Sequence, residues 1–121
     1  ANPRSGAHCL LTTERTAAWE GPGYPLIGVL QPGATYAVVV WARADVGAYP
    51  LTLTHKRRCT DDPAAGVYTQ LATRAVSAEW TELTAILVAP DCLLLESMVY
   101  VEAAPAGESF CIDDTSLELL P

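Results

Sequence analysis

The sequence predicts an all-β antiparallel sandwich of the jelly-roll type, and three observations lead to that prediction. Apolar and β-branched residues recur in about eight short segments, turn residues separate these segments, and no long stretch shows the 3.6-residue periodicity of a helix. Short strands at such regular spacing are typical of sandwiches and jelly rolls. A chain of 121 residues supports a single hydrophobic core, so we expect one domain over residues 1–121.

Runs rich in Val, Leu, Thr and Tyr, bounded by turn residues, define the individual strands. The expected strands span residues 7–13, 24–30, 35–44, 51–58, 67–76, 80–88, 93–102 and 110–119. The turn signals are Gly21-Pro22-Gly23, Gln31-Pro32-Gly33, Asp45 to Gly47, Asp61-Asp62-Pro63, Pro90-Asp91 and Pro105-Ala106-Gly107. Residues 72–78 have some helical character, but Thr73 and Val76 are β-branched and the alternation continues, so a strand is expected there.

Side chains alternate between the two faces of a strand, so the sequence also predicts which residues share a surface. The expected core sides of two strands are Tyr36, Val38, Val40 and Ala42, and Leu93, Leu95, Ser97, Val99 and Val101. The opposite side of 93–102 carries two carboxylates, a tyrosine and a methionine, a mixture that suits the floor of a groove. Tyr68 and Gln70 share a face, and Lys56 points outward. The alternative is an ordinary solvated face with scattered aromatic residues.

The charge of the chain restricts its partners. Fourteen acidic residues outnumber 7 basic ones and give a net charge of −7. Nucleic acid is therefore not expected as a partner, because phosphate binding depends on a basic face, and anionic polysaccharides are disfavoured for the same reason. No apolar stretch approaches the ~20 residues that span a membrane. A neutral ligand fits best.

The four cysteines are even in number and widely spaced, with no C-x-x-C pair of the kind found in zinc or redox sites. Two disulfides in an exported protein are therefore expected, and free buried thiols are the alternative. Three pairings are possible from sequence. We favour Cys9–Cys111 and Cys59–Cys92, because the ends of the chain often pair as edge strands in sandwiches.

Trp19 has unusual neighbours for a tryptophan. It stands in Arg15-Thr16-Ala17-Ala18-Trp19-Glu20-Gly21-Pro22, where the flanking residues are small or polar and give the ring little apolar cover. An exposed flat ring beside hydrogen-bonding groups suits a sugar, whose C–H faces stack on it while its hydroxyls need donors and acceptors. The alternative is a tryptophan that covers the edge of the core.

Several segments in colinear order resemble a known family. They include Ser5-Gly6-Ala7-His8-Cys9-Leu10, the Trp19 segment, Leu30-Gln31-Pro32-Gly33-Ala34-Thr35-Tyr36, Tyr68-Thr69-Gln70-Leu71-Ala72, Val99-Tyr100-Val101-Glu102 and Phe110-Cys111-Ile112-Asp113-Asp114. Together they resemble the β-jelly-roll carbohydrate-binding modules of families four, nine and twenty-two, which are attached to plant-cell-wall hydrolases. The chain departs from that pattern in lacking the usual leading strand and in having four cysteines, which indicates a divergent branch.

The resemblance implies non-catalytic binding of single β-linked glycan chains in a cleft on one sheet. It assigns the stacking tryptophan to Trp19, the groove tyrosine to Tyr68 and the hydrogen-bonding glutamate to Glu102. From the alternation and neighbouring positions we add Arg15, Gln70, Glu96, Tyr100 and Trp41. Trp41 would turn to the core if the register of its strand slipped by one residue. Trp80 is expected in the core, and the basic residues 56–58 are interpreted as a solvated strand end.

The resemblance also implies a structural calcium ion. Asp113 matches the family's carboxylate ligand, and Arg4 and Gly6 would offer carbonyl oxygens, since calcium takes six to eight oxygen ligands. The alternative is that Asp113 and Asp114 end a strand with ordinary turn hydrogen bonds.

The expected function is to hold an attached glycoside hydrolase on its substrate outside the cell. We expect β-1,4-linked glucans such as cellulose chains, β-glucan or xyloglucan, because Trp19, Tyr68 and Trp41 offer extensive apolar contact; xylan is the alternative.

An enzyme is not expected, since Glu96 and Glu102 lie ~20 Å apart on one strand, too far for the paired carboxyls of a glycosidase. A protein-binding adhesion sandwich is the alternative from another class, and it predicts a continuous apolar patch.

Overall fold

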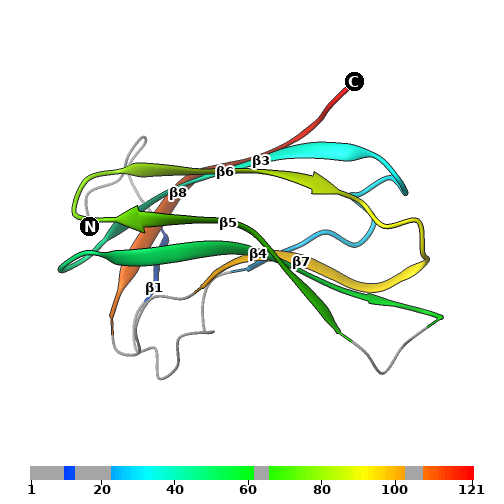
Figure 1. The fold of residues 1–121 in the computed structure, drawn as a ribbon, viewed down its shortest axis with the longest axis horizontal. Helices are drawn as coiled ribbons and strands as arrows, with labels where there is room; N and C mark the ends of the chain where they lie inside the picture. The colour runs from blue at the N-terminus through cyan, green and yellow to red at the C-terminus, as the bar shows by residue number, and fades with distance from the viewer. Residues whose placement is uncertain (1–9, 13–22, 62–65, 103–107) are drawn as a thin grey trace.

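The computed structural model describes residues 10–12, 23–61, 66–102 and 108–121, and shows two four-stranded sheets packed face to face (Figure 1). The strands are β1 (Leu10–Thr12), β2 (Gly23–Pro25), β3 (Thr35–Ala44), β4 (Tyr49–Cys59), β5 (Val67–Val76), β6 (Thr81–Val88), β7 (Leu94–Glu102) and β8 (Phe110–Leu119). The first sheet has the order β1-β8-β3-β6 and the second the order β2-β7-β4-β5. Every pairing is antiparallel, so the predicted sandwich is confirmed.

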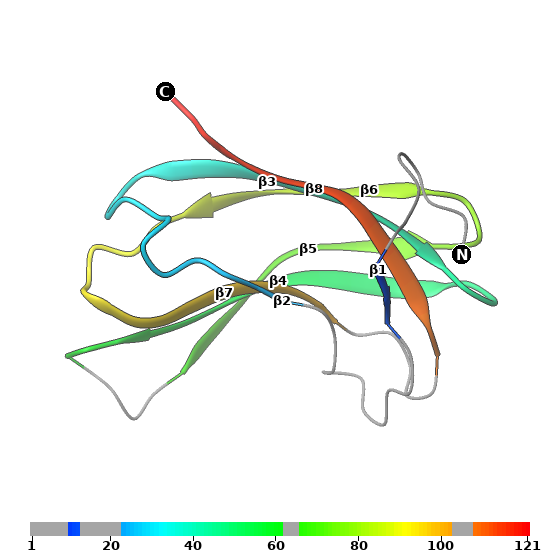
Figure 2. The same cartoon turned by 180° about the vertical axis from the view of Figure 1, so that it is seen from behind.

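The two layers are distinct in both views: β3, β6 and β8 form one, and β4, β5 and β7 the other (Figures 1 and 2). The short strands β1 and β2 lie at the outer edges of the two sheets, beside β8 and β7. The described part of the chain contains no helix with the length and apolar character needed to cross a bilayer.

The core lies between the sheets and follows the predicted alternation of β3. Tyr36, Val38, Val40 and Ala42 are all buried, and the second sheet faces them with Leu51, Leu53, Val99 and Val101. Each of these side chains gains roughly 1.5–3 kcal/mol from burial when it is a valine, leucine or larger. The same alternation leaves every second residue of β3, β4 and β7 on an outer surface.

Three β-bulges interrupt this alternation, and the sequence did not reveal them. In β7, Cys59 pairs with Leu94 while Arg58 pairs with Glu96, so Leu95 has no residue opposite it. The prediction that Leu93 and Leu95 belong to the core is therefore wrong, and they are 74% and 46% exposed. An extra residue in one strand resets which face its neighbours occupy.

A second bulge explains the two aspartates of β8. Val39 pairs with Ser116 and Trp41 with Asp113, so β8 carries one residue more than β3 in this interval. Asp114 has a φ of 48°, a left-handed conformation that aspartate tolerates better than most residues. Its backbone N–H donates to Asp113 Oδ1 over 2.8 Å. The two residues therefore lie within a strand and do not end it.

The disulfide Cys59–Cys92 is confirmed. It joins the end of β4 to the loop between β6 and β7, across 33 residues of sequence. Cys111 is also disulfide-bonded, while Cys9, the partner we favoured for it, lies outside the described residues. The alternative of free thiols does not hold for any described cysteine.

Trp80 is not a core residue, and that prediction is wrong. It lies just before β6, where Leu83, Ala85 and Leu87 face the core, so alternation places it on the outer side. The ring is partly buried, and the Arg43 guanidinium lies over it at 5.8 Å from the ring centroid. This cation–π contact belongs to the outer surface of the first sheet.

The open edges of the two sheets meet along β5 and β6. Each is the last strand of its sheet. Arg74 of β5 reaches across and donates from Nη1 to the backbone carbonyl of Glu82 in β6 over 2.8 Å. A side chain thus bridges the sheets at the edges where the described strands of both end.

Candidate functional site

The outer face of the second sheet collects most of the predicted site residues that the structure describes. Residues paired across strands project to the same side of a sheet. Thr54 of β4 pairs with Gln70 on one side and Tyr100 on the other, and Thr52 pairs with Glu102. Three of the expected binding residues, from β5 and β7, therefore share one surface with the threonines of β4 between them.

Tyr68 and Glu96 extend this surface toward the end of β4. Lys56 pairs with Tyr68, and Arg58 pairs with Glu96. The surface that carries Tyr68, Gln70, Glu96, Tyr100 and Glu102 is called the binding face below. Alternation predicted Glu96, Tyr100 and Glu102 to lie opposite the core and put Tyr68 and Gln70 on one shared face, and the pairing of the strands brings the two sets together.

The middle of the binding face is buried. Thr52 and Thr54 point outward, yet they are only 3% and 1% exposed. Thr52 exchanges a hydrogen bond with Thr73, with 2.8 Å between the two Oγ1 atoms. The buried Thr54 hydroxyl has no hydrogen-bond partner within the described part of the chain. The larger residues on either side therefore form the accessible part of the face.

Tyr100 and Glu102 form a polar pair on β7. Burial of the phenol and the neighbouring Glu102 carboxylate raise the pKa of Tyr100 well above its ordinary value. The phenol consequently stays protonated. A hydroxyl donor and a carboxylate acceptor thus lie next to each other beside the buried threonines.

Tyr68 supplies an open aromatic surface on β5. Its side chain is 59% exposed. The Lys56 ammonium lies over the ring at 5.6 Å from its centroid, and the same Nζ lies 2.8 Å from Glu96 Oε1. Arg58 Nε approaches the other carboxylate oxygen of Glu96 at 3.7 Å. Lys56 and Arg58 together hold the pKa of Glu96 below its usual range, Lys56 having the larger effect.

Lys56 is the residue that sequence reasoning missed. It was interpreted with its neighbours as a solvated strand end, although alternation already placed it outward beside Thr52 and Thr54. The missing information was the identity of its cross-strand partners. Only the pairing of β4 with both β5 and β7 shows that Lys56 lies between Tyr68 and Glu96.

The structure does not bring Trp41 to the binding face. Trp41 belongs to β3 in the first sheet, and the side chains of its neighbours Val40 and Ala42 fill the core. Trp41 therefore lies on the outer surface of the opposite sheet, where it pairs with Glu82 and Asp113. Membership of a sheet depends on long-range pairing, which local alternation does not reveal.

The expected residues Arg15 and Trp19 lie outside the described residues, as do the expected calcium ligands Arg4 and Gly6. Asp113 is described, in β8, on the sheet opposite the binding face. No group of three or more His, Cys, Asp or Glu side chains suited to a metal ion occurs among residues 10–12, 23–61, 66–102 and 108–121. Calcium therefore stays a prediction that rests on the resemblance.

Comparison with known proteins decides the class of the molecule. A family model described as a carbohydrate binding domain matches residues 1–106. The chain belongs to this family. It is accordingly a binding module and not a catalytic domain. The expectation of a carbohydrate-binding module, drawn from colinear sequence blocks, is confirmed.

The module has relatives among xylanases. An endo-1,4-beta-xylanase A of Thermoanaerobacterium saccharolyticum is 32% identical over 113 residues, which are 93% of this chain and 10% of that protein. An endo-1,4-beta-xylanase A of Thermotoga neapolitana is 25% identical over 115 residues. The module spans about a tenth of the length of the curated relatives it matches.

Solved structures of similar modules share the fold. The CBM22-1 xylan-binding domain of Paenibacillus barcinonensis Xyn10C gives a TM-score of 0.86 at 22% identity, covering 96% of this chain and 74% of that one. The C-terminal family 22 carbohydrate binding module of Clostridium thermocellum Xyn10B gives a TM-score of 0.84 at 25% identity, with the same coverage of 96% and 74%.

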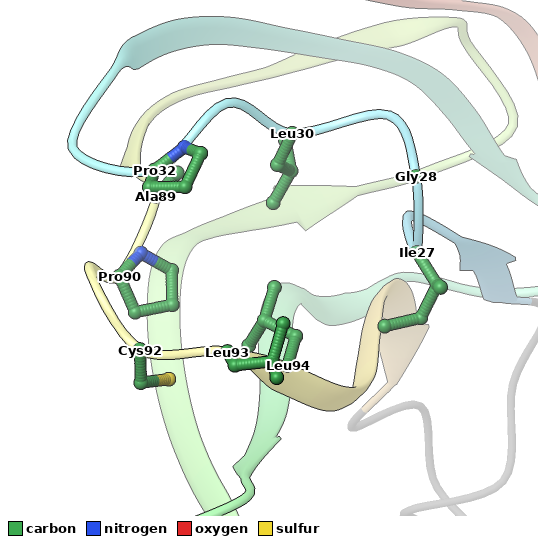
Figure 3. A pocket seen from close by; sticks show the side chains of 9 residues that line it. All are labelled: Ile27, Gly28, Leu30, Pro32, Ala89, Pro90, Cys92, Leu93 and Leu94. Atoms are coloured by element: carbon green, nitrogen blue, oxygen red, sulfur yellow. The ribbon is translucent and has the colours of Figure 1, made fainter.

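The module also has a pocket of about 210 Å³ at one end of the sandwich (Figure 3). Two loops enclose it, one after β2 and one between β6 and β7. The residues that line it are Ile27, Gly28, Leu30, Pro32, Ala89, Pro90, Cys92, Leu93 and Leu94. None of these side chains carries a nitrogen or oxygen atom, so this pocket does not suit the hydroxyls of a sugar as the binding face does.

Proposed function

We propose that the module binds xylan through the binding face and thereby holds an attached glycoside hydrolase on its substrate. The observation that carries this proposal is the gathering of Tyr68, Gln70, Glu96, Tyr100 and Glu102 on the outer side of one sheet. The xylanase relatives support the choice of ligand, and the family supports the mode of action.

The proposal replaces the expectation of a glucan ligand. That expectation rested on three rings, Trp19, Tyr68 and Trp41, because glucose residues carry a hydroxymethyl group that offers additional apolar contact. Trp41 lies on the other sheet, so the face has one ring fewer than expected. A xylose chain lacks the hydroxymethyl group and needs less apolar contact, which favours xylan.

Recognition follows from the chemistry of the ligand. The exposed Tyr68 ring offers a flat surface to the C–H faces of a sugar, at a low cost in side-chain entropy. The Gln70 amide and the Glu102 carboxylate provide donors and acceptors for hydroxyl groups that leave water. Each such hydrogen bond contributes only about 1 kcal/mol, because water competes for both partners. A dissociation constant of roughly micromolar to sub-millimolar follows.

We further propose that the protein acts outside the cell. The Cys59–Cys92 disulfide supports this, because such bonds persist in oxidising compartments. Plant cell-wall polysaccharide is also an extracellular substrate, so the hydrolase and its module must both reach it there.

The decisive experiment compares ligands and one pair of variants. Isothermal titration calorimetry is performed with soluble xylan, mixed-linked β-glucan, xyloglucan and hydroxyethyl cellulose. Tyr68→Ala is compared with Trp41→Ala, which removes a ring from the opposite sheet. Xylan should bind most tightly. Tyr68→Ala should weaken the binding of xylan by roughly 1–3 kcal/mol, and Trp41→Ala should bind xylan like the parent. Preference for a glucan would overturn the ligand, and unchanged binding by Tyr68→Ala would overturn the face.

A further inference from the structure

Lys56, on the inner strand β4, contacts a carboxylate and an aromatic ring on the two neighbouring strands of the binding face. Its Nζ lies 2.8 Å from Glu96 Oε1 of β7 and 5.6 Å from the centroid of the Tyr68 ring of β5. A single side chain therefore joins three adjacent strands across the surface on which the glycan is proposed to lie.

The Tyr68 ring lies on an exposed part of the sheet. Val67, Tyr68, Thr69 and Gln70 are all exposed, and β5 is the edge strand of its sheet. Gly66 also lies next to the ring: a methyl group built there would lie 3.4 Å from Tyr68 Cε2 and 3.7 Å from Lys56 Cε. Lys56 and the backbone at Gly66 are thus two contacts of the ring within the described residues.

Lys56 is itself held by charge. The ion pair with Glu96 is its strongest contact, and the hydrogen bond to that carboxylate raises the pKa of the lysine. Arg58 Nε lies 3.7 Å from the second oxygen of Glu96, so each carboxylate oxygen has a cation near it. Fixing Glu96 fixes the ammonium, and the ammonium attracts the electron-rich face of the Tyr68 ring.

We propose that Lys56 is a positioning residue for glycan binding: its ion pair with Glu96 and its contact with Tyr68 hold the ring in the orientation that receives the sugar. The inference rests on the proposed function of the binding face. It predicts that salt weakens the binding of a neutral glycan. Xylose chains without acidic substituents are uncharged, so their binding should otherwise respond little to salt.

Salt sensitivity follows from the exposure of the ion pair. The side chains of Lys56 and Glu96 are 26% and 34% exposed, so dissolved ions reach both. The screening length falls from about 30 Å at 0.01 M ionic strength to about 3 Å at 1 M. High salt therefore weakens the ion pair, releases the lysine from its place and lets the Tyr68 ring sample other orientations before the sugar arrives.

The test titrates xylohexaose, a neutral oligosaccharide, into four proteins by calorimetry at about 0.01 M and about 1 M ionic strength. The proteins are the parent, Lys56→Met, Lys56→Arg and the control Arg43→Met. The control also removes one positive charge and one cation–π contact, but from Trp80 on the other sheet. Thermal unfolding of each protein verifies that it is folded.

The parent should lose roughly two- to fivefold in affinity at high salt, the range expected for an exposed ion pair. Lys56→Met should bind roughly three- to tenfold more weakly at low salt and show no further loss at high salt. Lys56→Arg should keep most of the affinity and the salt response, and Arg43→Met should behave like the parent. Parent-like binding by Lys56→Met at both salt concentrations would overturn the proposal, as would an undiminished salt response in that variant.

A second measurement separates this inference from the choice of ligand. In the free protein, the NMR signals of the Tyr68 ring should shift and sharpen in Lys56→Met and stay in place in Arg43→Met. Unchanged Tyr68 signals in Lys56→Met would overturn the positioning role whatever glycan binds. Failure of xylohexaose to bind the parent would instead overturn the proposed function alone.

Discussion

Tyr100 and Glu102 stand two residues apart on β7, with both side chains on the outer face of the second sheet, and the carboxylate next to the phenol helps to raise the pKa of Tyr100. The pair lies beside the buried threonines of β4, with Tyr100 opposite Thr54 and Glu102 opposite Thr52. The raised pKa keeps the phenol protonated, so it stays a donor next to the carboxylate acceptor. Preorganised acceptors lose less entropy on binding than mobile ones.

Removal of the phenol hydroxyl should expose that effect. Tyr100→Phe leaves the ring in place but removes the hydroxyl next to Glu102, so we expect xylan affinity to fall by about 1–3 kcal/mol with a small change in melting temperature. Tyr24→Phe is the matched control, since it removes a phenol hydroxyl from the neighbouring strand β2 on the other side of the sheet. Equal affinities of the two variants in calorimetry would show that the pair plays no part in binding.

Trp19 is expected to carry stacking energy, as the resemblance implies. Trp19→Ala should weaken binding of a soluble xylan by roughly 1–3 kcal/mol and change the melting temperature little. Trp41→Ala should leave xylan affinity at the parent value. Affinity electrophoresis and differential scanning calorimetry measure both quantities. If Trp19→Ala unfolds the protein, the tryptophan covers the core instead.

Calcium removal should affect stability and leave binding unchanged. The expected ligand Asp113 lies on the sheet opposite the binding face, so excess EGTA should lower the melting temperature without altering xylan affinity. The shift should follow RT ln(1 + [L]/Kd) as calcium is added back. Asp113→Ala should remove the dependence on calcium. Identical melting curves with and without EGTA would exclude a structural calcium ion.

Acid should destabilise the fold through His55. This imidazole is 3% exposed, its Nε2 lies 2.9 Å from Ser97 Oγ, and burial together with the Arg57 charge lowers its pKa. The unfolded chain therefore binds more protons than the folded one once the pH falls below about 6.5, the ordinary histidine value. The free energy of unfolding should decrease from that pH downward, by up to about 1.4 kcal/mol per pH unit, until the folded-state pKa is reached.

Urea denaturation between pH 7 and pH 5 measures this slope for the parent and for His55→Gln. The variant should be less stable at pH 7, since it perturbs a buried site, and its stability should change less across the interval. The Glu96 carboxyl, whose pKa is lowered, contributes only at more acidic pH. An equal slope in both proteins would assign the acid sensitivity to other groups.

The Cys59–Cys92 disulfide should contribute substantially to stability. It closes a loop across 33 residues, and the chain-entropy model gives roughly 3–4 kcal/mol for a loop of this length. The double variant Cys59→Ser and Cys92→Ser should show that loss in urea denaturation under oxidising conditions. A loss below about 1 kcal/mol would mean that the connected segments are ordered independently of the bond.

Much of the fold was predictable because it depends on local pattern. Six of the eight strands lie within two residues of their expected bounds, including 35–44, 67–76 and 110–119, which agree at both ends. The outward positions of Tyr100 and Glu102 followed from alternation, which also put Tyr68 and Gln70 on one face. Family resemblance then added the type of ligand, which alternation cannot supply.

The errors share a physical origin in long-range pairing. Leu95 left the core because a bulge opposite Cys59 shifted the alternation, and nothing in the residues of β7 marks that bulge. Trp41 faces away from the core, as alternation predicted, but its strand belongs to the other sheet. Lys56 looked like a strand end until its partners on β5 and β7 were known.

Arg74 has a consequence for how the molecule behaves at high concentration. An unpaired sheet edge attracts strands of other molecules and so promotes aggregation. By donating to the backbone carbonyl of Glu82, Arg74 occupies an acceptor on the free edge of β6 and places a charge beside β5. The guanidinium thereby obstructs the side of the sandwich on which an incoming chain would otherwise add a strand, which favours solubility of the isolated module.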